Sequence, residues 1–227
     1  MADSIIPPEN LFAELPADLS RGLFETSRTI ALGADQTLFL AGDAGDACYR
    51  VEDGLLKASV FAAGGDEHIL AIFGPGSLVG ELSMIDGMAR SASVAALRRS
   101  KLSRISRASF DAFAKSNPEL CRHVMRLLSR RLRETNIALA AASFLPQTGR
   151  VARVLLSLAD AFGNDVGGGR ILVRQKVTQT DLAGMAGLAR ENVSRVLKDW
   201  TERSFVSRLA GYYCLENKAA IEREVAM

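Results

Sequence analysis

The pattern of hydrophobic and polar positions changes twice along the chain. Between residues 28 and 108, short alternating or apolar segments are separated by glycines at intervals of roughly ten residues, which is typical of an antiparallel sandwich or barrel. The predicted strands cover residues 37–40, 48–51, 55–61, 68–73, 93–97 and 101–105. Ahead of this region, apolar residues around Leu11-Phe12 and at 19–24 predict one or two short helices.

A helical period replaces the strand pattern over residues 108–144. Ser109 is the expected cap of a short helix, and Asn117-Pro118 marks the start of a second helix. Pro146 predicts the end of this second helix, which should run for about 25 residues. Apolar positions recur on it at alternating steps of four and three: Cys121, Met125, Leu128, Leu132, Thr135, Leu139 and Ala142. This heptad seam predicts a partner helix and therefore a homodimer.

One position of the seam is polar. Thr135 lies between Leu132 and Leu139, and Asn136 follows it. A threonine within a helix can bond back to a carbonyl of its own helix. The alternative is that a polar group from elsewhere lies against the seam at this level.

The pattern after Pro146 predicts a third part of the chain. Residues 147–161 should form an amphipathic helix that stops at Gly163, and residues 163–169 a flexible loop before a short strand at 171–173. From Pro146 onward the chain has 12 basic and 9 acidic residues, a balance that is compatible with nucleic-acid binding.

A two-helix motif follows this strand. Thr178 is the expected cap of a helix, with Asp181 three residues later, and a turn at Gly187 leads into a second helix over 190–200. Two short helices around a glycine turn describe a helix-turn-helix, and the segments 206–208 and 212–214 describe its wing. The alternative is a two-helix corner that binds protein.

The segment 80–92 is the only helix-permissive stretch within the predicted β region. Arg90 can pair bidentately with phosphate oxygens, Ser91 can donate to them, and Glu81 can accept from a ribose hydroxyl. Backbone N–H groups in such a turn can add to an anion site. The combination suits a phosphorylated sugar, and the alternative is a surface loop with a local ion pair.

Composition narrows the classes of function. The chain has 227 residues, 48% of them hydrophobic and 24% charged, which is enough for one large or two small globular domains. Its three cysteines lack metal spacing, and neither a Ser-His-Asp arrangement nor a Walker loop is found, so we expect no enzyme. The chain also shows no signal peptide and no membrane-spanning apolar run, so we expect a cytoplasmic protein without a membrane partner.

Three motifs together resemble the cAMP receptor protein (Crp/Fnr) family of transcription regulators over nearly the whole chain. They are the segment from Gly80-Glu81-Leu82 to Arg90-Ser91-Ala92, the seam helix with Arg130-Arg131-Leu132 and Thr135-Asn136, and the run Arg190-Glu191-Asn192-Val193-Ser194-Arg195. The resemblance implies an α+β fold. Its parts are an N-terminal, jelly-roll-like cyclic-nucleotide-binding β-roll (1–116), a long dimerisation helix (117–145) and a C-terminal winged helix-turn-helix (146–227).

The resemblance also implies a ligand. Segment 80–92 looks like the phosphate-binding cassette of the family, in which Glu81 takes the ribose hydroxyl, and Arg90 and Ser91 take the cyclic phosphate. Thr135 falls on the position whose hydroxyl meets the adenine amino group, and Asn136 on the position that reaches the nucleotide of the partner subunit. The expected ligand-binding residues are Gly80, Glu81, Leu82, Arg90, Ser91, Thr135 and Asn136. The expected effector is cAMP, with cGMP or ligand-independent action as alternatives.

The second helix of the motif resembles a recognition helix that reads TGTGA-type half-sites in double-stranded DNA. The expected DNA-binding residues are Thr178, Gln179, Arg190, Glu191, Ser194 and Arg195. An alternative function is a signalling adaptor that uses a cyclic-nucleotide domain. Such an adaptor would not need Arg190 and Arg195 exposed on a recognition helix. RNA polymerase is a further expected partner, with the 163–169 loop as the candidate contact.

Some residues depart from the family pattern. Pro146 replaces an aspartate at the hinge, which leaves open how strongly ligand binding is coupled to the DNA-binding domain. Ser194 replaces a glycine and resembles the Fnr branch. The identity of the outer base pairs of each half-site is therefore left open. The iron–sulfur cysteines of that branch are missing and His68 has no nearby cysteine, so we expect no metal, haem or iron–sulfur cluster.

Overall fold

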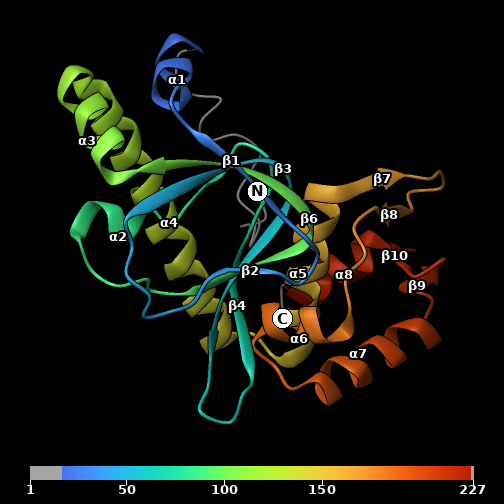
Figure 1. Ribbon diagram of the computed structural model, residues 1–227. Helices are drawn as coiled ribbons and strands as arrows, with labels where there is room; N and C mark the ends of the chain where they lie inside the picture. The colour runs from blue at the N-terminus through green and yellow to red at the C-terminus, as the bar shows by residue number, and fades with distance from the viewer. Residues whose placement is uncertain (1–16, 226–227) are drawn as a thin grey trace. The chain divides into compact units, whose positions relative to one another are not determined.

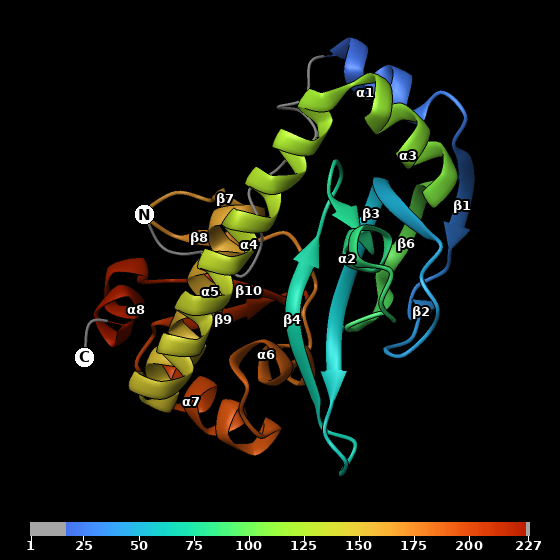
Figure 2. The same cartoon turned by 90° about the vertical axis from the view of Figure 1, so that its left-hand side faces the viewer.

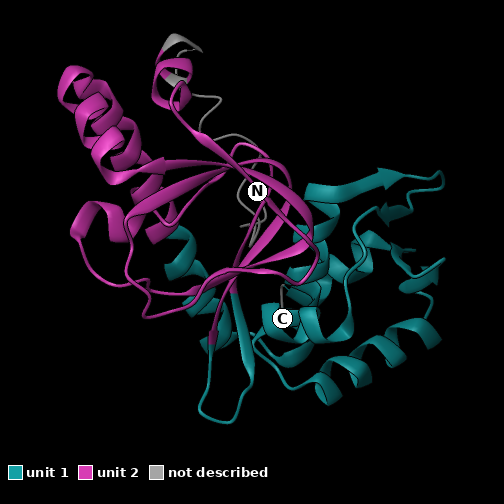
Figure 3. Ribbon diagram, viewed as in Figure 1, with its two compact units in different colours: residues 1–6, 61–69, 133–227 teal, residues 7–60, 70–132 magenta. Residues whose placement is uncertain are grey.

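The computed structural model describes residues 17–225, which form two compact units (Figures 1 and 3). We call residues 17–60 and 70–132 the β-roll unit, and residues 61–69 and 133–225 the C-terminal unit. The tip of the hairpin between β3 and β4 thus belongs with residues much later in the sequence (Figure 3). The helical piece predicted around Leu11-Phe12 lies outside the described residues.

One antiparallel sheet forms the frame of the β-roll unit. Its strands are β1 (Arg28–Leu32), β2 (Thr37–Phe39), β3 (Ala47–Phe61), β4 (Glu67–Phe73), β5 (Leu78–Val79) and β6 (Ser93–Ser106). They follow the order β1-β6-β3-β4, with β2 also paired to β6 and β5 to β3. The predicted antiparallel β-roll is confirmed, whereas β1 and β5 have no counterpart among the predicted strands.

The two longest strands run through positions at which the sequence predicts breaks. The ladder between β3 and β6 is irregular at Asp53 and Leu55, yet it continues on both sides. Gly54 has a φ of 102°, and a Cβ there would collide with Ser100 on β6. Glycine at this position therefore permits a bulge rather than ending the strand. The hydroxyl of Ser100 accepts a hydrogen bond from the N–H of Leu55 at 3.0 Å.

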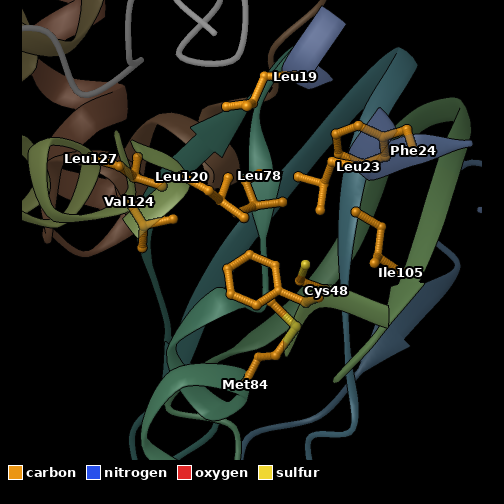
Figure 4. Packing of buried hydrophobic residues seen from close by; sticks show 11 residues of the cluster. Leu19, Leu23, Phe24, Cys48, Leu78, Met84, Ile105, Leu120, Val124 and Leu127 are labelled. Carbon is orange, nitrogen blue, oxygen red and sulfur yellow. The ribbon is translucent and has the colours of Figure 1, made fainter. Parts of the chain in front are cut away.

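Helices cover one end of this sheet around a shared apolar cluster. Helix α1 (Ala17–Phe24) and helix α3 (Arg107–Ser116) contribute to it together with the first half of α4 (Figure 4). The prediction that Ser109 caps α3 is wrong. The cap is Ser106, whose hydroxyl accepts from the N–H of Ser109 at 3.1 Å.

Helix α4 (Pro118–Phe144) is one uninterrupted helix of 27 residues that starts where Asn117-Pro118 predicts (Figure 2). It carries two apolar rows that are offset by one residue. Leu120, Val124 and Leu127 form the first row and are buried in the cluster. The second row is the predicted seam, which remains largely exposed in the single chain: Met125 is 60%, Leu132 62% and Leu139 67% exposed.

The C-terminal unit holds the remaining elements. They are α5 (Gln147–Phe162), β7 (Gly163–Asp165), β8 (Ile171–Val173), α6 (Gln179–Ala186), α7 (Arg190–Glu202), β9 (Val206–Leu209), β10 (Tyr212–Leu215) and α8 (Lys218–Val225). The sheet order is β7-β8-β10-β9, and β9 and β10 form the predicted wing. The prediction of a loop over 163–169 is wrong for residues 163–165, which pair with β8 as an edge strand.

Candidate functional site

The cassette, residues 80–92, consists of helix α2 (Glu81–Asp86) and the loop that leads to β6. Gly80 precedes α2 with a left-handed φ of 81°. A Cβ at Gly80 would lie only 2.6 Å from Nη1 of Arg90 and 3.3 Å from the ring of Phe39. Glycine is therefore required both for the backbone turn and for the close approach of the Arg90 guanidinium.

Arg90 is almost entirely buried, with 5% of its surface exposed. Its Nη1 donates to the carbonyl oxygen of Gly80 and its Nη2 to that of Ala47, each at 2.7 Å. The guanidinium lies 4.2 Å from the ring centre of Phe39, and its Nε is buried without a hydrogen-bond partner. A buried cation that is held by neutral carbonyls and has a donor to spare suits an anionic ligand.

Glu81 is 2% exposed and forms an ion pair with Arg131 of α4. Nη2 of Arg131 donates to the carbonyl oxygen of Leu78 at 2.5 Å, and its guanidinium lies 5.0 Å from the ring centre of Phe73. A buried carboxylate is tolerated only when it is paired and hydrogen-bonded. The pair therefore ties the cassette to the long helix.

Arg107 holds the cassette from a second side. Its Nη2 donates to the carbonyl oxygens of Gly45 at 3.0 Å and of Ser83 at 2.5 Å. A Cβ at Gly45 would collide with the side chain of Ser83, so this loop lies directly against α2. The backbone of Arg90 is bonded to the same loop, because its N–H donates to the carbonyl oxygen of Asp43 at 2.8 Å.

Below the cassette lies the apolar cluster. Met84 of α2 and Cys48 of β3 both belong to it, as Figure 4 shows. Burial raises the pKa of the Cys48 thiol to about 12, and the nearby Glu81 carboxylate acts in the same direction. The thiol is therefore neutral at physiological pH and serves as a small apolar group.

The predicted ligand-binding residues are divided between the two units. Gly80, Glu81 and Arg90 come together in the β-roll unit. Leu82 is 42% exposed, and Ser91 is exposed on the loop after Arg90. Thr135 and Asn136 are exposed on the part of α4 that belongs to the C-terminal unit, so their approach to a nucleotide stays a prediction.

The two-helix motif has the predicted caps. The hydroxyl of Thr178 accepts from the N–H of Asp181 at 3.0 Å, and the Asp181 carboxylate accepts from the N–H of Thr178 at 2.9 Å. This capping box starts α6. Gly187 ends α6 with a left-handed φ of 59°, and α7 begins three residues later at Arg190.

Helix α7 separates a packing face from an exposed face. Val193, Leu197 and Trp200 are buried in the C-terminal unit. The exposed positions include Arg190, Glu191, Ser194 and Arg195, which are four of the six residues predicted to bind DNA. Of the two candidates at the start of α6, the cap residue Thr178 is exposed, and Gln179 in the first turn is half-buried.

Within residues 17–225, no helix is both long and apolar enough to cross a bilayer. In the same range, no group of three or more His, Cys, Asp or Glu side chains is arranged to hold a metal ion.

Comparison with known proteins assigns both parts of the chain. Residues 29–117 match the family model of the cyclic nucleotide-binding domain, and residues 149–224 match that of the Crp-like helix-turn-helix domain. The chain is also 32% identical over 209 residues to a CRP-like cAMP-activated global transcriptional regulator from Mycobacterium tuberculosis, with 92% of each chain covered. The chain belongs to the CRP/FNR family of transcription regulators.

Other relatives agree with this CRP/FNR assignment. The chain is 35% identical over 189 residues to the cyclic AMP receptor protein of Thermus thermophilus, covering 83% of each. A CRP-family transcriptional regulator of known structure, also from Thermus thermophilus, superposes with a TM-score of 0.74 at 26% identity, over 87% of this chain and 97% of that one. These relatives are transcription regulators rather than enzymes.

Sequence reasoning missed the contacts that three side chains outside the cassette make with it. Arg131 continues the buried row of Leu120, Val124 and Leu127 at the next helical step, so its inward position could have been read from the periodicity. Arg107 and Phe39 leave no such signal, because their contacts with the cassette depend on how β2, α3 and α2 meet in space.

The ion pair between Glu81 and Arg131 makes a prediction about stability. Arg131→Met should lower the free energy of unfolding by about 3 kcal/mol, because it leaves a buried carboxylate without a partner. Adding Glu81→Gln to this variant should restore a large part of the loss. Urea unfolding at pH 7 measures both, with Arg126→Met, an exposed position of the same helix, as the control. Equal stability of Arg131→Met and Arg126→Met would contradict the assignment.

Proposed function

We propose that this CRP/FNR-family regulator binds cAMP through the cassette and Thr135, and that nucleotide binding controls its affinity for palindromic DNA. The observation that carries the proposal is the buried guanidinium of Arg90, held at Gly80 by neutral carbonyls. The proposed division of labour is ligand binding in residues 1–116, dimerisation in 117–145 and DNA binding in 146–227.

The cassette supports a cyclic phosphate as the ligand. Nε of Arg90 has a free donor, and Ser91 is exposed beside it. Glu81 has one carboxylate oxygen on Arg131, which leaves its other oxygen as an acceptor for the ribose hydroxyl. The names of the relatives from Mycobacterium tuberculosis and Thermus thermophilus favour cAMP over cGMP.

The seam of α4 supports a homodimer. Met125, Leu132 and Leu139 are large apolar side chains that the single chain leaves exposed at heptad spacing. Thr135 lies on this seam one helical turn after Arg131, which pairs with the cassette. A purine at Thr135 would therefore lie beside the partner helix, where Asn136 of the partner subunit could reach it.

The winged helix-turn-helix supports the DNA part of the proposal. Arg190 and Arg195 are exposed on α7 and can bond to O6 and N7 of guanine, and Glu191 can accept from cytosine N4. In a dimer with two-fold symmetry the two α7 helices read half-sites about one helical turn of DNA apart. TGTGA-type half-sites are the proposed targets. Contact with RNA polymerase through the β7–β8 hairpin is also proposed.

The nucleotide site can be tested by calorimetry. Arg90→Gln should weaken cAMP binding by about 100-fold, because charge-assisted hydrogen bonds to the phosphate are lost. Arg99→Gln, an exposed position on β6, should bind cAMP like the unchanged protein. If folded Arg90→Gln bound cAMP normally, the cassette would not be the nucleotide site.

The effector can be identified by measuring the DNA affinity of the unchanged protein without nucleotide, with cAMP and with cGMP. Equal affinity in all three would show that no nucleotide controls DNA binding.

The recognition helix can be tested by DNA selection. Arg190→Ala should cost about 1–3 kcal/mol in binding free energy and relax the preference for one guanine in each half-site. Arg223→Ala, an exposed position on α8, provides the matched control. If Arg190→Ala changed neither affinity nor base preference, α7 would not read DNA through this residue.

The dimer can be tested by sedimentation equilibrium. Leu132→Glu should raise the dissociation constant of the dimer by about 100-fold, because an unpaired carboxylate would be buried in the seam at a cost of about 3 kcal/mol. Ser129→Glu adds the same charge to an exposed position outside the seam and should leave the dimer intact. Equal dissociation constants for the two variants would place the interface elsewhere.

A further inference from the structure

The hairpin tip, Phe61–Ile69, packs against the helix-turn-helix within the C-terminal unit. One close approach is at Gly184, a buried residue inside α6. A Cβ there would lie 3.1 Å from Cγ1 of Ile69 and 3.3 Å from the carbonyl oxygen of Glu67. Glycine in a helix interior costs about 1 kcal/mol relative to alanine. Its presence in α6 is explained by the space that the hairpin tip needs.

The hairpin tip also contacts the turn between α6 and α7. A Cβ at Gly187 would lie 3.1 Å from Cε1 and 3.3 Å from Nδ1 of His68. Arg150 of α5 holds the same turn, because its Nε donates to the carbonyl oxygen of Ala186 at 2.9 Å and its Nη2 to that of Gly187 at 2.5 Å. The turn that precedes the recognition helix is therefore held both by α5 and by the hairpin tip.

Burial along β4 distinguishes the side chain that makes this contact. Ile69 is 2% exposed, whereas the next residue, Leu70, is 48% exposed. Successive side chains of a strand point to opposite faces, so Ile69 and Leu70 form a matched pair of apolar residues of which only Ile69 lies against α6.

The charge of the hairpin tip decides the direction of its effect on DNA binding. Its sequence includes Asp66 and Glu67, the backbone carbonyl of Glu67 lies against Gly184, and Arg190 follows Gly187 by three residues. DNA carries a dense row of phosphate charges. Acidic residues on the segment that packs against α6 oppose the approach of phosphates to the N-terminal end of α7.

We propose that the hairpin tip is an autoinhibitory strap, which holds the α6–α7 turn and lowers the affinity of the recognition helix for DNA until the strap is displaced. This inference rests on the proposed DNA-binding function and adds a regulatory contact to it. Displacement of the strap raises DNA affinity without any nucleotide, within the range of about 5- to 150-fold that allosteric coupling usually spans.

The test compares Ile69→Ala with Leu70→Ala in the full-length protein. DNA binding is measured by fluorescence anisotropy on a selected operator fragment, without nucleotide and with saturating cAMP. Ile69→Ala should bind DNA at least about 5-fold more tightly than the unchanged protein without nucleotide, and Leu70→Ala should not. Unchanged or weaker binding by folded Ile69→Ala would overturn the strap.

A second variant guards against a folding defect in the first. Gly184→Ala favours the helical state of α6 and pushes the hairpin tip away, so it should raise nucleotide-free DNA affinity in the same direction. Gly64→Ala serves as its control, since a Cβ there meets no neighbour within 4 Å. Failure of Gly184→Ala to raise the affinity counts against the strap as well.

Hydrogen exchange separates failure of the strap from failure of the proposed function. The strap predicts faster amide exchange over residues 183–190 in Ile69→Ala than in Leu70→Ala, with neither DNA nor nucleotide present. Equal exchange would overturn the strap even if the unchanged protein binds DNA with cAMP. If the unchanged protein bound no DNA in any nucleotide state, the proposed function would fail, and exchange would still decide whether the hairpin tip holds the turn.

Discussion

A buried carboxylate that must be paired organises the β-roll unit. Glu81 opens the cassette helix in a place that solvent hardly reaches, and the cation that neutralises it comes from α4. Losing either charge leaves the other uncompensated in a low-dielectric interior. The cassette and the long helix are therefore set with respect to each other by electrostatics, while the apolar cluster below them supplies most of the buried surface.

The cost of burying an uncompensated charge also distinguishes the roles of the two arginines at the cassette. Arg90 and Arg131 both lie against the same short helix, and they have different tasks. Arg131 is balanced by a carboxylate and serves to position Glu81. Arg90 is bonded to neutral carbonyls and keeps its charge uncompensated by these contacts, so it is the one suited to a phosphate. Gly80 and Gly45 make this possible because a side chain at either position would collide with the cassette or with Arg90.

Elements that depend on local signals were predictable from the sequence. The capping box at Thr178, the start of α4 at Pro118 and the wing around Gly211 are each encoded within a few residues. Features that depend on distant partners were not. Gly54 looks like a strand break until Ser100 is placed opposite it, and Arg107 looks like a surface residue until Gly45 and Ser83 come within its reach. The cassette could be predicted as a candidate site because its residue types carry their chemistry in one short segment.

The three cysteines are too far apart in sequence for a metal site. Their positions in the fold make them useful as chemical probes. Cys48 is fully buried in the β-roll unit, Cys214 is fully buried in the C-terminal unit, and Cys121 is exposed on α4. A thiol reagent can reach either buried sulfur only when the unit around it opens. The unaltered chain thus carries a separate chemical reporter for the opening of each unit, and a third on the face where a second copy would bind.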